Sequence, residues 1–295
     1  MTATANPQVE FYFDPKAHAY TVDGKTLPSV TTIIDHVCSG GMAHARANMV
    51  AKRASNLAML AKRGEKILDP ETMLEVDPLD LLCNQRWLAK EPSVQLAKAR
   101  NRGTIMHMQF GAWADEYCVN VADVAHWVEN TIADERIDAD IDETTGYCLS
   151  TLCWLDTFDI RILAVETPVF NPGEGYIGTA DAWASPGKGP LAGEVWLLEA
   201  KSSESSSINH GYQEAAYLRA PWAIPGQGVV ELQEPPTPDR IVTLLVQPGS
   251  VTPREWTRDQ IPDLYAGFLA CKKVYDQRKG ITPTTLKQYR FKEIL

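Results

Sequence analysis

The sequence predicts a protein of the α/β class, more narrowly α+β, with a central mixed β-sheet flanked by helices. Helical patterns fill most of the first 160 residues. Three strand-like runs then follow one another, LAVETPVF, GYIGTADAWA and EVWLLEAKSS, separated by turns that carry glycine and proline. A helix, a strand and a last helix complete the pattern. Helices first and a meander in the middle predict one domain over residues 1–295.

The N-terminal part begins with a predicted hairpin. EFYFDPKAHAYTV, at 10–22, mixes aromatic and β-branched residues around a turn, and Asp23-Gly24 follows as a second turn signal. LPSVTTIIDHV, at 27–37, then offers Ser29 as the N-cap of a helix with apolar residues at helical spacing beyond it. We expect the hairpin and the helical region to occupy 10–160, the sheet core 161–250, and a C-terminal helix and tail 251–295.

The remaining elements follow from composition and from proline and glycine positions. Residues 42–66 are rich in alanine, lysine, arginine and methionine and are predicted to be helical. Pro78 and Pro92 are expected to divide the next stretch into shorter helices. Before the central strands, we expect two helices in 93–118 interrupted at Arg102-Gly103-Thr104, and helix over 120–162 with an acidic loop at 137–144. After them, we expect helix over 210–223, a connector at 225–238, a strand at 240–249 and a helix near 256–279.

Bulk composition limits the class of protein. Hydrophobic residues make up 44% and charged residues 22%, which is ordinary for a globular chain. No apolar run approaches the roughly 18 residues that a membrane span needs, so we expect no membrane partner. MTATANPQVEF lacks the pattern of a secretory signal. The six cysteines form no CxxC pair, which argues against a zinc knuckle or a disulfide framework and favours a reduced, cytoplasmic setting. The net charge of -10 is weak evidence against a protein that coats nucleic acid.

Acidic and basic residues alternate onto one face of two strand candidates. In LLEAKSS, Glu199 and Lys201 share a face with Leu197, because successive side chains of a strand point to opposite sides. Asp181 lies on the preceding strand candidate, just after Gly178. If the two strands pair, Asp181 and Glu199 lie side by side, and a hard divalent cation would relieve their repulsion. Lys201 would then stabilise negative charge or help to orient or deprotonate a water.

Residues outside these strands could complete such a site. His107 lies on a helix after RGTIMH and could contribute a nitrogen ligand. Gln213 and Tyr217 are four residues apart on the following helix and share a face. Basic residues precede the His107 helix and recur near the C-terminus, and they could mark a nucleic-acid path: Arg86, Lys90, Lys98, Arg100, Arg102, Lys272, Lys273, Arg278 and Lys279.

The ordered pieces RGTIMH, GTAD, EAK and QEAAY resemble the PD-(D/E)xK nuclease superfamily, in particular its RecB-like and phage-exonuclease branch. The opening HAYTVDGKTLPSVTTII resembles the N-terminus of many phage-encoded members, so the resemblance covers roughly residues 10–250. It implies a restriction-endonuclease-like core with a helical N-terminal elaboration. It implies these roles: His107, Asp181 and Glu199 as ligands of Mg²⁺ or Mn²⁺; Asp181, Glu199 and Lys201 as catalytic; Gln213, Tyr217 and Glu166 as supporting or DNA-binding. Arg102, one of the basic residues, is also predicted to be supporting or DNA-binding.

The resemblance also implies a biological role. It implies a deoxyribonuclease, more specifically an exonuclease that degrades DNA from an end, acting on duplex ends or single strands in phage-type recombination, repair or end processing. A single-strand-annealing protein is the implied partner, and a homo-oligomer is compatible with the analogy. Iron–sulfur members of the branch carry four suitably placed cysteines, and here only Cys271 follows Cys153, so no iron–sulfur cluster is expected.

Each motif also has a plainer interpretation. Glu199 and Lys201 could form a solvated strand face, and His107 could be a hydrogen-bonded helix histidine. Asp181 could cap a turn after Gly178. At the level of the whole protein, the alternatives are a catalytically silent module of the same fold that binds DNA or protein, and a metal-dependent hydrolase of another substrate.

Overall fold

The computed structural model describes residues 6–15, 17–38, 40–69, 72–114 and 121–279. The expected tail beyond residue 279 and the expected end of a helix at 115–118 lie outside these residues.

A six-stranded mixed sheet forms the centre of the molecule, in the order β12-β11-β8-β7-β6-β9. Its strands are β6 (Ile160–Asn171), β7 (Tyr176–Pro186), β8 (Trp196–Lys201), β9 (Trp222–Ala223), β11 (Arg240–Gln247) and β12 (Ser250–Trp256). Strands β8 and β11 run parallel, and the other neighbours run antiparallel. The strand predictions between 163 and 203 and at 240–249 are therefore confirmed, and so is the mixed sheet.

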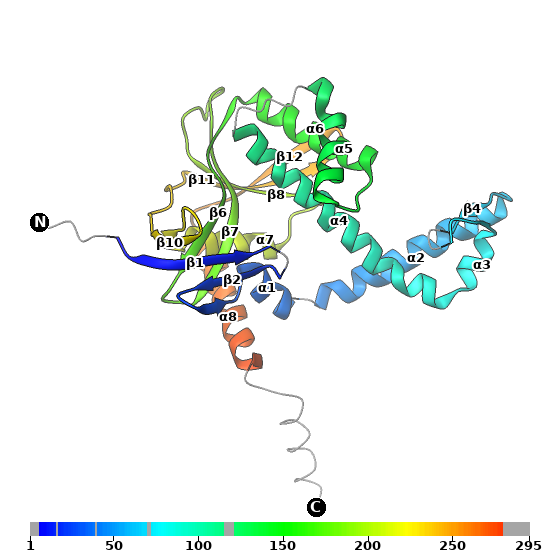
Figure 1. Ribbon diagram of the computed structural model, residues 1–295, viewed down its shortest axis with the longest axis horizontal. Helices are drawn as coiled ribbons and strands as arrows, with labels where there is room; N and C mark the ends of the chain where they lie inside the picture. The colour runs from blue at the N-terminus through cyan, green and yellow to red at the C-terminus, as the bar shows by residue number, and fades with distance from the viewer. Residues whose placement is uncertain (1–5, 16, 39, 70–71, 115–120, 280–295) are drawn as a thin grey trace, which may run out of the picture.

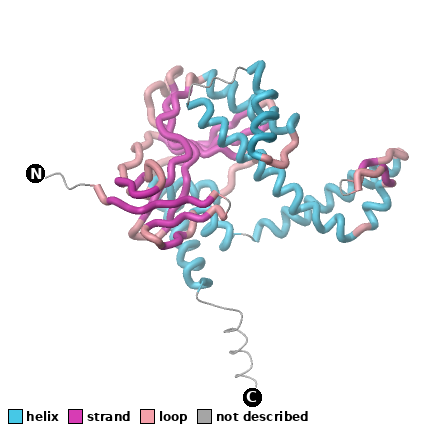
Figure 2. The backbone as a smooth tube through the Cα atoms, in the orientation of Figure 1, coloured by secondary structure: helices cyan, strands magenta, loops and turns pink. Residues whose placement is uncertain are grey.

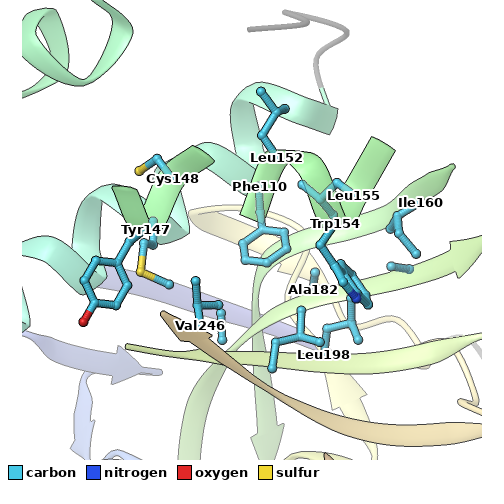
Figure 3. Packing of buried hydrophobic residues seen from close by; sticks show 14 of the residues in the cluster. Phe110, Tyr147, Cys148, Leu152, Trp154, Leu155, Ile160, Ala182, Leu198 and Val246 are labelled. Atoms are coloured by element: carbon cyan, nitrogen blue, oxygen red, sulfur yellow. The ribbon is translucent and has the colours of Figure 1, made fainter. Parts of the chain in front are cut away.

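Helices cover both faces of this sheet (Figures 1 and 2). On one face lie the C-terminal part of α4 (Gln85–Ala114), α5 (Val124–Glu135) and α6 (Ile141–Thr157), and the turn η1 (Val121–Asp123) precedes α5. Figure 3 shows their apolar side chains, Phe110 and Leu155 among them, packed with Ala182 and Leu198 of the sheet. The other face carries α1 (Val30–Cys38), α7 (Ile208–Leu218) and α8 (Ile261–Lys279). The alternation predicted for β8 is confirmed, because Leu198 belongs to the first core and Leu197 to the second.

The predicted N-terminal hairpin forms part of a second sheet, in the order β10-β1-β2-β3. Its strands are β1 (Gln8–Asp14), β2 (Ala19–Val22), β3 (Lys25–Leu27) and β10 (Gly228–Glu231). Apolar residues of this sheet, such as Phe11 and Tyr20, share a small core with Phe170 and Ile177 of the central sheet. The hairpin is thereby held beside the ends of β6 and β7. Ser29 caps α1 as predicted, since its Oγ accepts a hydrogen bond from Thr32 N–H at 3.0 Å.

A helical arm extends away from the two sheets (Figure 1). It consists of α2 (Gly40–Lys62), α3 (Pro78–Cys83) and the N-terminal part of α4, with β4 (Ile67–Leu68) paired to β5 (Glu75–Val76). Pro78 opens α3, as expected of proline at a first helical position. The predicted breaks at Pro92 and at Arg102-Gly103-Thr104 are wrong, because α4 runs through both as one helix of 30 residues. Packing against α2 on one side and the sheet on the other outweighs the local cost of one proline and one glycine.

The other corrections concern where the predicted helices and loops begin and end. Helix α7 ends at Leu218 and not at 223, because Trp222 and Ala223 pair with β6. The connector at 225–238 contains β10, and residues 250–256 form β12, so the last helix begins at Ile261. The acidic loop at 137–144 ends early, since Asp140 accepts from Glu143 N–H at 2.8 Å and α6 starts at Ile141. Distant strands supply most of these pairings, which local propensity does not reveal.

Two cysteines that are far apart in the sequence meet in the structure. Cys38 on α1 and Cys271 on α8 have their Sγ atoms 3.8 Å apart. Burial is the main cause that raises the pKa of Cys271 to about 11.

None of the helices in the described part of the chain has the length and apolar character needed to cross a bilayer.

Candidate functional site

A cavity of about 170 Å³ lies where the hairpin, α1, α4, the central sheet and α7 meet. Seven of the eight residues proposed from the sequence line it: His107, Glu166, Asp181, Glu199, Lys201, Gln213 and Tyr217. The other lining residues are His18, Tyr20, Ser29, Thr31, Gly178 and Thr179. Arg102 is absent from the lining. The tertiary structure therefore brings together side chains from segments more than 100 residues apart.

The sheet register places the two strand carboxylates side by side. Ala182 on β7 is opposite Leu198 on β8, so the next position of each strand puts Asp181 opposite Glu199. The regular β7–β8 pairing ends at Ala182 and Leu198, and just beyond it Ala200 N–H donates to Asp181 Oδ2 at 2.7 Å. Asp181 and Glu199 are 3% and 1% exposed, so the interpretation of Glu199 as part of a solvated strand face is wrong.

Three groups from three elements form a compact set of metal-ligand atoms. His107 Nε2 lies 3.3 Å from Asp181 Oδ2, and His107 Nδ1 lies 3.6 Å from Glu166 Oε1. One ligand atom from each of the three residues lies within 4.8 Å of the others. A nitrogen and two carboxylates at this separation suit a divalent cation. The sequence put Glu199 in this set and gave Glu166 a supporting role, whereas the structure groups Glu166 with His107 and Asp181.

Glu166 is held in an unfavourable backbone conformation. Its φ is +45°, in the left-handed region that side chains other than glycine seldom adopt, although it lies within strand β6. Pairing shifts register between Ile162 and Ala164, which are just upstream. Such a conformation costs of order 1–3 kcal/mol and is common at functional sites.

We therefore expect Glu166→Gly to raise the free energy of unfolding by about 1 kcal/mol while weakening divalent-cation affinity at least tenfold. Glycine adopts positive φ freely but supplies no ligand. Urea unfolding in EDTA would measure stability, and Mn²⁺ titration by calorimetry would measure affinity. Glu166→Gln is the matched control, because it removes the charge and keeps the backbone preference. Equal stabilities of the two variants would show that the backbone at Glu166 is unstrained.

Glu199 has one satisfied and one unsatisfied oxygen. Its Oε1 accepts from Lys201 Nζ and Gln213 Nε2, both at 2.6 Å. Its Oε2 is buried and has no hydrogen-bond partner among the described residues. Burial, followed by the charge of Asp181, raises the pKa of Glu199 to about 7. An orphaned carboxylate oxygen beside a carboxylate and a histidine fits a site that takes a cation.

The surroundings of Lys201 keep its side chain positively charged. Burial lowers its pKa, but the charges of Glu199 and Asp181 outweigh burial and raise the pKa above its ordinary value. A lysine with a raised pKa stays protonated at neutral pH. This favours electrostatic stabilisation and water positioning over removal of a proton by Lys201.

Helix α7 holds Glu199 through a glutamine and a tyrosine. Gln213 Nε2 donates to Glu199 Oε1 and to the hydroxyl oxygen of Tyr217, the latter at 2.8 Å. Gly178 on β7 allows Tyr217 to approach, because a Cβ there would lie 2.5 Å from Tyr217 Cε1. Both α7 residues are buried.

The N-terminal hairpin supplies lining residues that the sequence analysis did not single out. The hydroxyl groups of Tyr20 and Thr179 lie 2.8 Å apart. Tyr20 stacks on Phe13, whose ring meets His18 edge-on. The sequence predicted HAYTV only as part of a hairpin and of a resemblance, and the signal available for a site role was its aromatic alternation.

Arg102 lies outside the site. Its Nη1 is 2.5 Å from Glu143 Oε1, and its guanidinium carbon lies 4.2 Å over the ring of Tyr147. The side chain is buried, with 9% of the residue exposed. It anchors α4 to α6.

Divalent-cation stabilisation is expected to grow as pH rises. Burial and Asp181 raise the pKa of Glu166 to about 7, and Glu199 has a similar pKa, against 4.5 in the unfolded chain. Between these pH values the folded state holds more protons, so stability without metal falls as pH rises. Metal needs the ionised carboxylates. We expect Mn²⁺ at about 100 times Kd to add about 2.7 kcal/mol at pH 8 and far less at pH 5. Thermal melts with Mn²⁺ or EDTA would measure this, and a shift that is equal at both pH values would contradict it.

No protein-family model matches the chain, and no curated protein matches it.

Proposed function

We propose that the protein is a metal-dependent nuclease that hydrolyses phosphodiester bonds. The observation that carries the proposal is the convergence of His107, Glu166 and Asp181 beside the unsatisfied oxygen of Glu199, with Lys201 at hydrogen-bond distance. The order of these residues in the chain is that of the PD-(D/E)xK motifs. We accordingly propose that the central sheet with its flanking helices is a restriction-endonuclease-like core.

His107, Glu166 and Asp181, with Glu199 adjoining, would hold Mg²⁺ or Mn²⁺. A bound ion of this kind supplies Lewis-acid activation of water and neutralisation of charge on a phosphate. The protein residues orient the carboxylates and stabilise the developing charge. Ala200 N–H fixes the orientation of Asp181, and Gln213 fixes Glu199. The Lys201 ammonium, kept protonated by these carboxylates, would stabilise the charge that develops on the scissile phosphate.

DNA is the proposed substrate, processed from duplex ends or single strands in phage-type recombination, repair or end processing. The motif resemblance supports this part of the proposal, together with a single-strand-annealing protein as partner and a homo-oligomer as the assembly. The cysteine pattern supports a cytoplasmic site of action. The net charge of -10 favours the alternative of a metal-dependent hydrolase acting on another substrate.

The test is cleavage of end-labelled linear duplex and single-stranded DNA with Mg²⁺, Mn²⁺ or EDTA. We expect degradation with either metal, none with EDTA, and a rate about 10²-fold lower for Lys201→Met, which removes the cation but keeps most of the side-chain volume. The product ladder gives the polarity. A wild-type protein that cleaves neither substrate with either metal would refute the proposal.

A further inference from the structure

Positive charge is concentrated on two helices of an otherwise acidic chain. Helices α2 (Gly40–Lys62) and α4 (Gln85–Ala114) together contain nine lysines and arginines and one acidic residue, Glu91. The whole chain carries a net charge of -10. These two helices build most of the arm that extends from the sheets (Figure 1). The segregation is specific to these helices, because the segment joining them, residues 63–84, carries six acidic and two basic residues.

The basic side chains converge where the arm joins the rest of the protein. A groove of about 340 Å³ between α2 and α4 is lined by Lys52, Arg53, Lys98 and Arg102, with Glu143 of α6 at its edge. Glu143 is already paired with Arg102. Like charges gathered in one groove repel one another, and a cleft lined by one sign of charge attracts counter-charge. The arrangement therefore suits an anionic ligand. Amide side chains of Asn56 and Gln95 add hydrogen-bonding groups to the lining.

Helix α4 connects this groove to the candidate active site. It carries His107, which lines the cavity, and runs without a break back through Lys98 to Arg86. At 1.5 Å per residue, Lys98 lies about 14 Å and Arg86 about 32 Å from His107 along the helix. Duplex DNA rises 3.4 Å per base pair, so this length matches about nine base pairs. Arg86 and Arg100 are exposed along this line.

We propose that α2 and α4 form a basic arm that binds the phosphate backbone of duplex DNA leading to the cavity. The inference rests on the proposed nuclease function and deepens it by assigning the surface that grips the substrate. Phosphates are regularly spaced along a duplex, so a duplex suits charges repeated along a continuous helix better than a compact acidic peptide does. Arg102, tied to Glu143 and Tyr147, is a positioning residue that fixes the root of the arm.

The test measures DNA binding in EDTA, where cleavage does not contribute. Fluorescence anisotropy with a labelled 30-base-pair duplex would compare wild type with the triple variant Lys52→Ser, Lys98→Ser and Arg100→Ser. The control removes three exposed charges from other elements: Lys188→Ser, Arg254→Ser and Lys273→Ser. We expect the arm variant to bind at least tenfold more weakly at 0.15 M salt and the slope of log K against log salt to fall by about 3. The control should stay within twofold of wild type.

Further measurements keep the test decisive. The double variant Lys52→Arg and Lys98→Arg keeps both positive charges and should bind DNA as tightly as wild type. This result would show that the arm variant loses affinity because it loses charge and not because it misfolds. An arm variant that binds as tightly as wild type, or displacement of DNA by polyglutamate of equal charge, would overturn the proposal. Hydrolysis of bis(p-nitrophenyl) phosphate by wild type with Mn²⁺ reports on the cavity without the arm. If the protein binds DNA through the arm but hydrolyses neither substrate, the nuclease function is refuted and the proposal of a DNA-binding arm stands. If it cleaves DNA at a rate that does not depend on the arm charges, only the proposal of a DNA-binding arm is refuted.

Discussion

Asp181→Asn is expected to lower the rate of metal-dependent DNA cleavage by about 10³-fold, equivalent to about 4 kcal/mol of transition-state stabilisation. Asp181 is the best-placed carboxylate of the site. It is 3% exposed, lies 3.3 Å from His107 Nε2, and is fixed by the Ala200 N–H. An asparagine oxygen can still accept that N–H, so the strand ends stay in place. The variant removes a charge that a divalent cation needs, and it leaves the fold unchanged.

Single-turnover cleavage with Mn²⁺ would measure this effect, and Mn²⁺ calorimetry would show whether the loss follows from metal binding. Asp156→Asn is the matched control, because it makes the same change at an exposed position of α6. Retention of more than a tenth of the wild-type rate by Asp181→Asn would rule out Asp181 as a catalytic metal ligand. Asp181 would then be a structural residue whose carboxylate accepts the Ala200 N–H.

Gly178→Ala is expected to lower the free energy of unfolding by about 1–3 kcal/mol and to disturb the site at the same time. A Cβ at Gly178 would lie 2.5 Å from Tyr217 Cε1 and 3.1 Å from Val30 Cγ2. Both neighbours are buried, so neither can move without loss of packing. Displacement of Tyr217 would also weaken its hydrogen bond with Gln213, which holds Glu199. Urea unfolding and the cleavage rate would both be measured.

Gly103→Ala provides a control of opposite sign. Gly103 lies within α4, and a Cβ there meets nothing within 4 Å. Alanine is favoured over glycine by about 0.5–1 kcal/mol inside a helix, so stability should rise. If both substitutions destabilised the protein equally, the close approach at Gly178 would not be the cause.

Local sequence patterns were sufficient for much of the architecture. Alternation in LLEAKSS identified the buried and site-facing sides of β8, and Ser29 marked the start of α1. The antiparallel pairing of two neighbouring strands was enough to place Asp181 opposite Glu199, because a two-residue period and a short connection leave few registers. The sequence alone thus determined the α+β class, the central mixed sheet and most of the residues that line the cavity.

The tertiary structure alone decided which carboxylate joins His107 and Asp181. Glu166 lies opposite Asp181 in the β6–β7 register, since Val165 pairs with Ala182 and Thr167 with Ala180, and that register follows a shift between Ile162 and Ala164 that no local propensity encodes. Arg102 pairs with Glu143 of α6, 41 residues away, and therefore does not line the cavity. Helix α4 continues through Pro92 because it packs against α2 and α3. The physical reason is common to all three. Strand period and helix capping depend on neighbouring residues. The grouping of metal ligands, the pairing of Arg102 and the tolerance of Pro92 within α4 depend on contacts between distant segments. The energies of those contacts outweigh local preferences of about 1 kcal/mol.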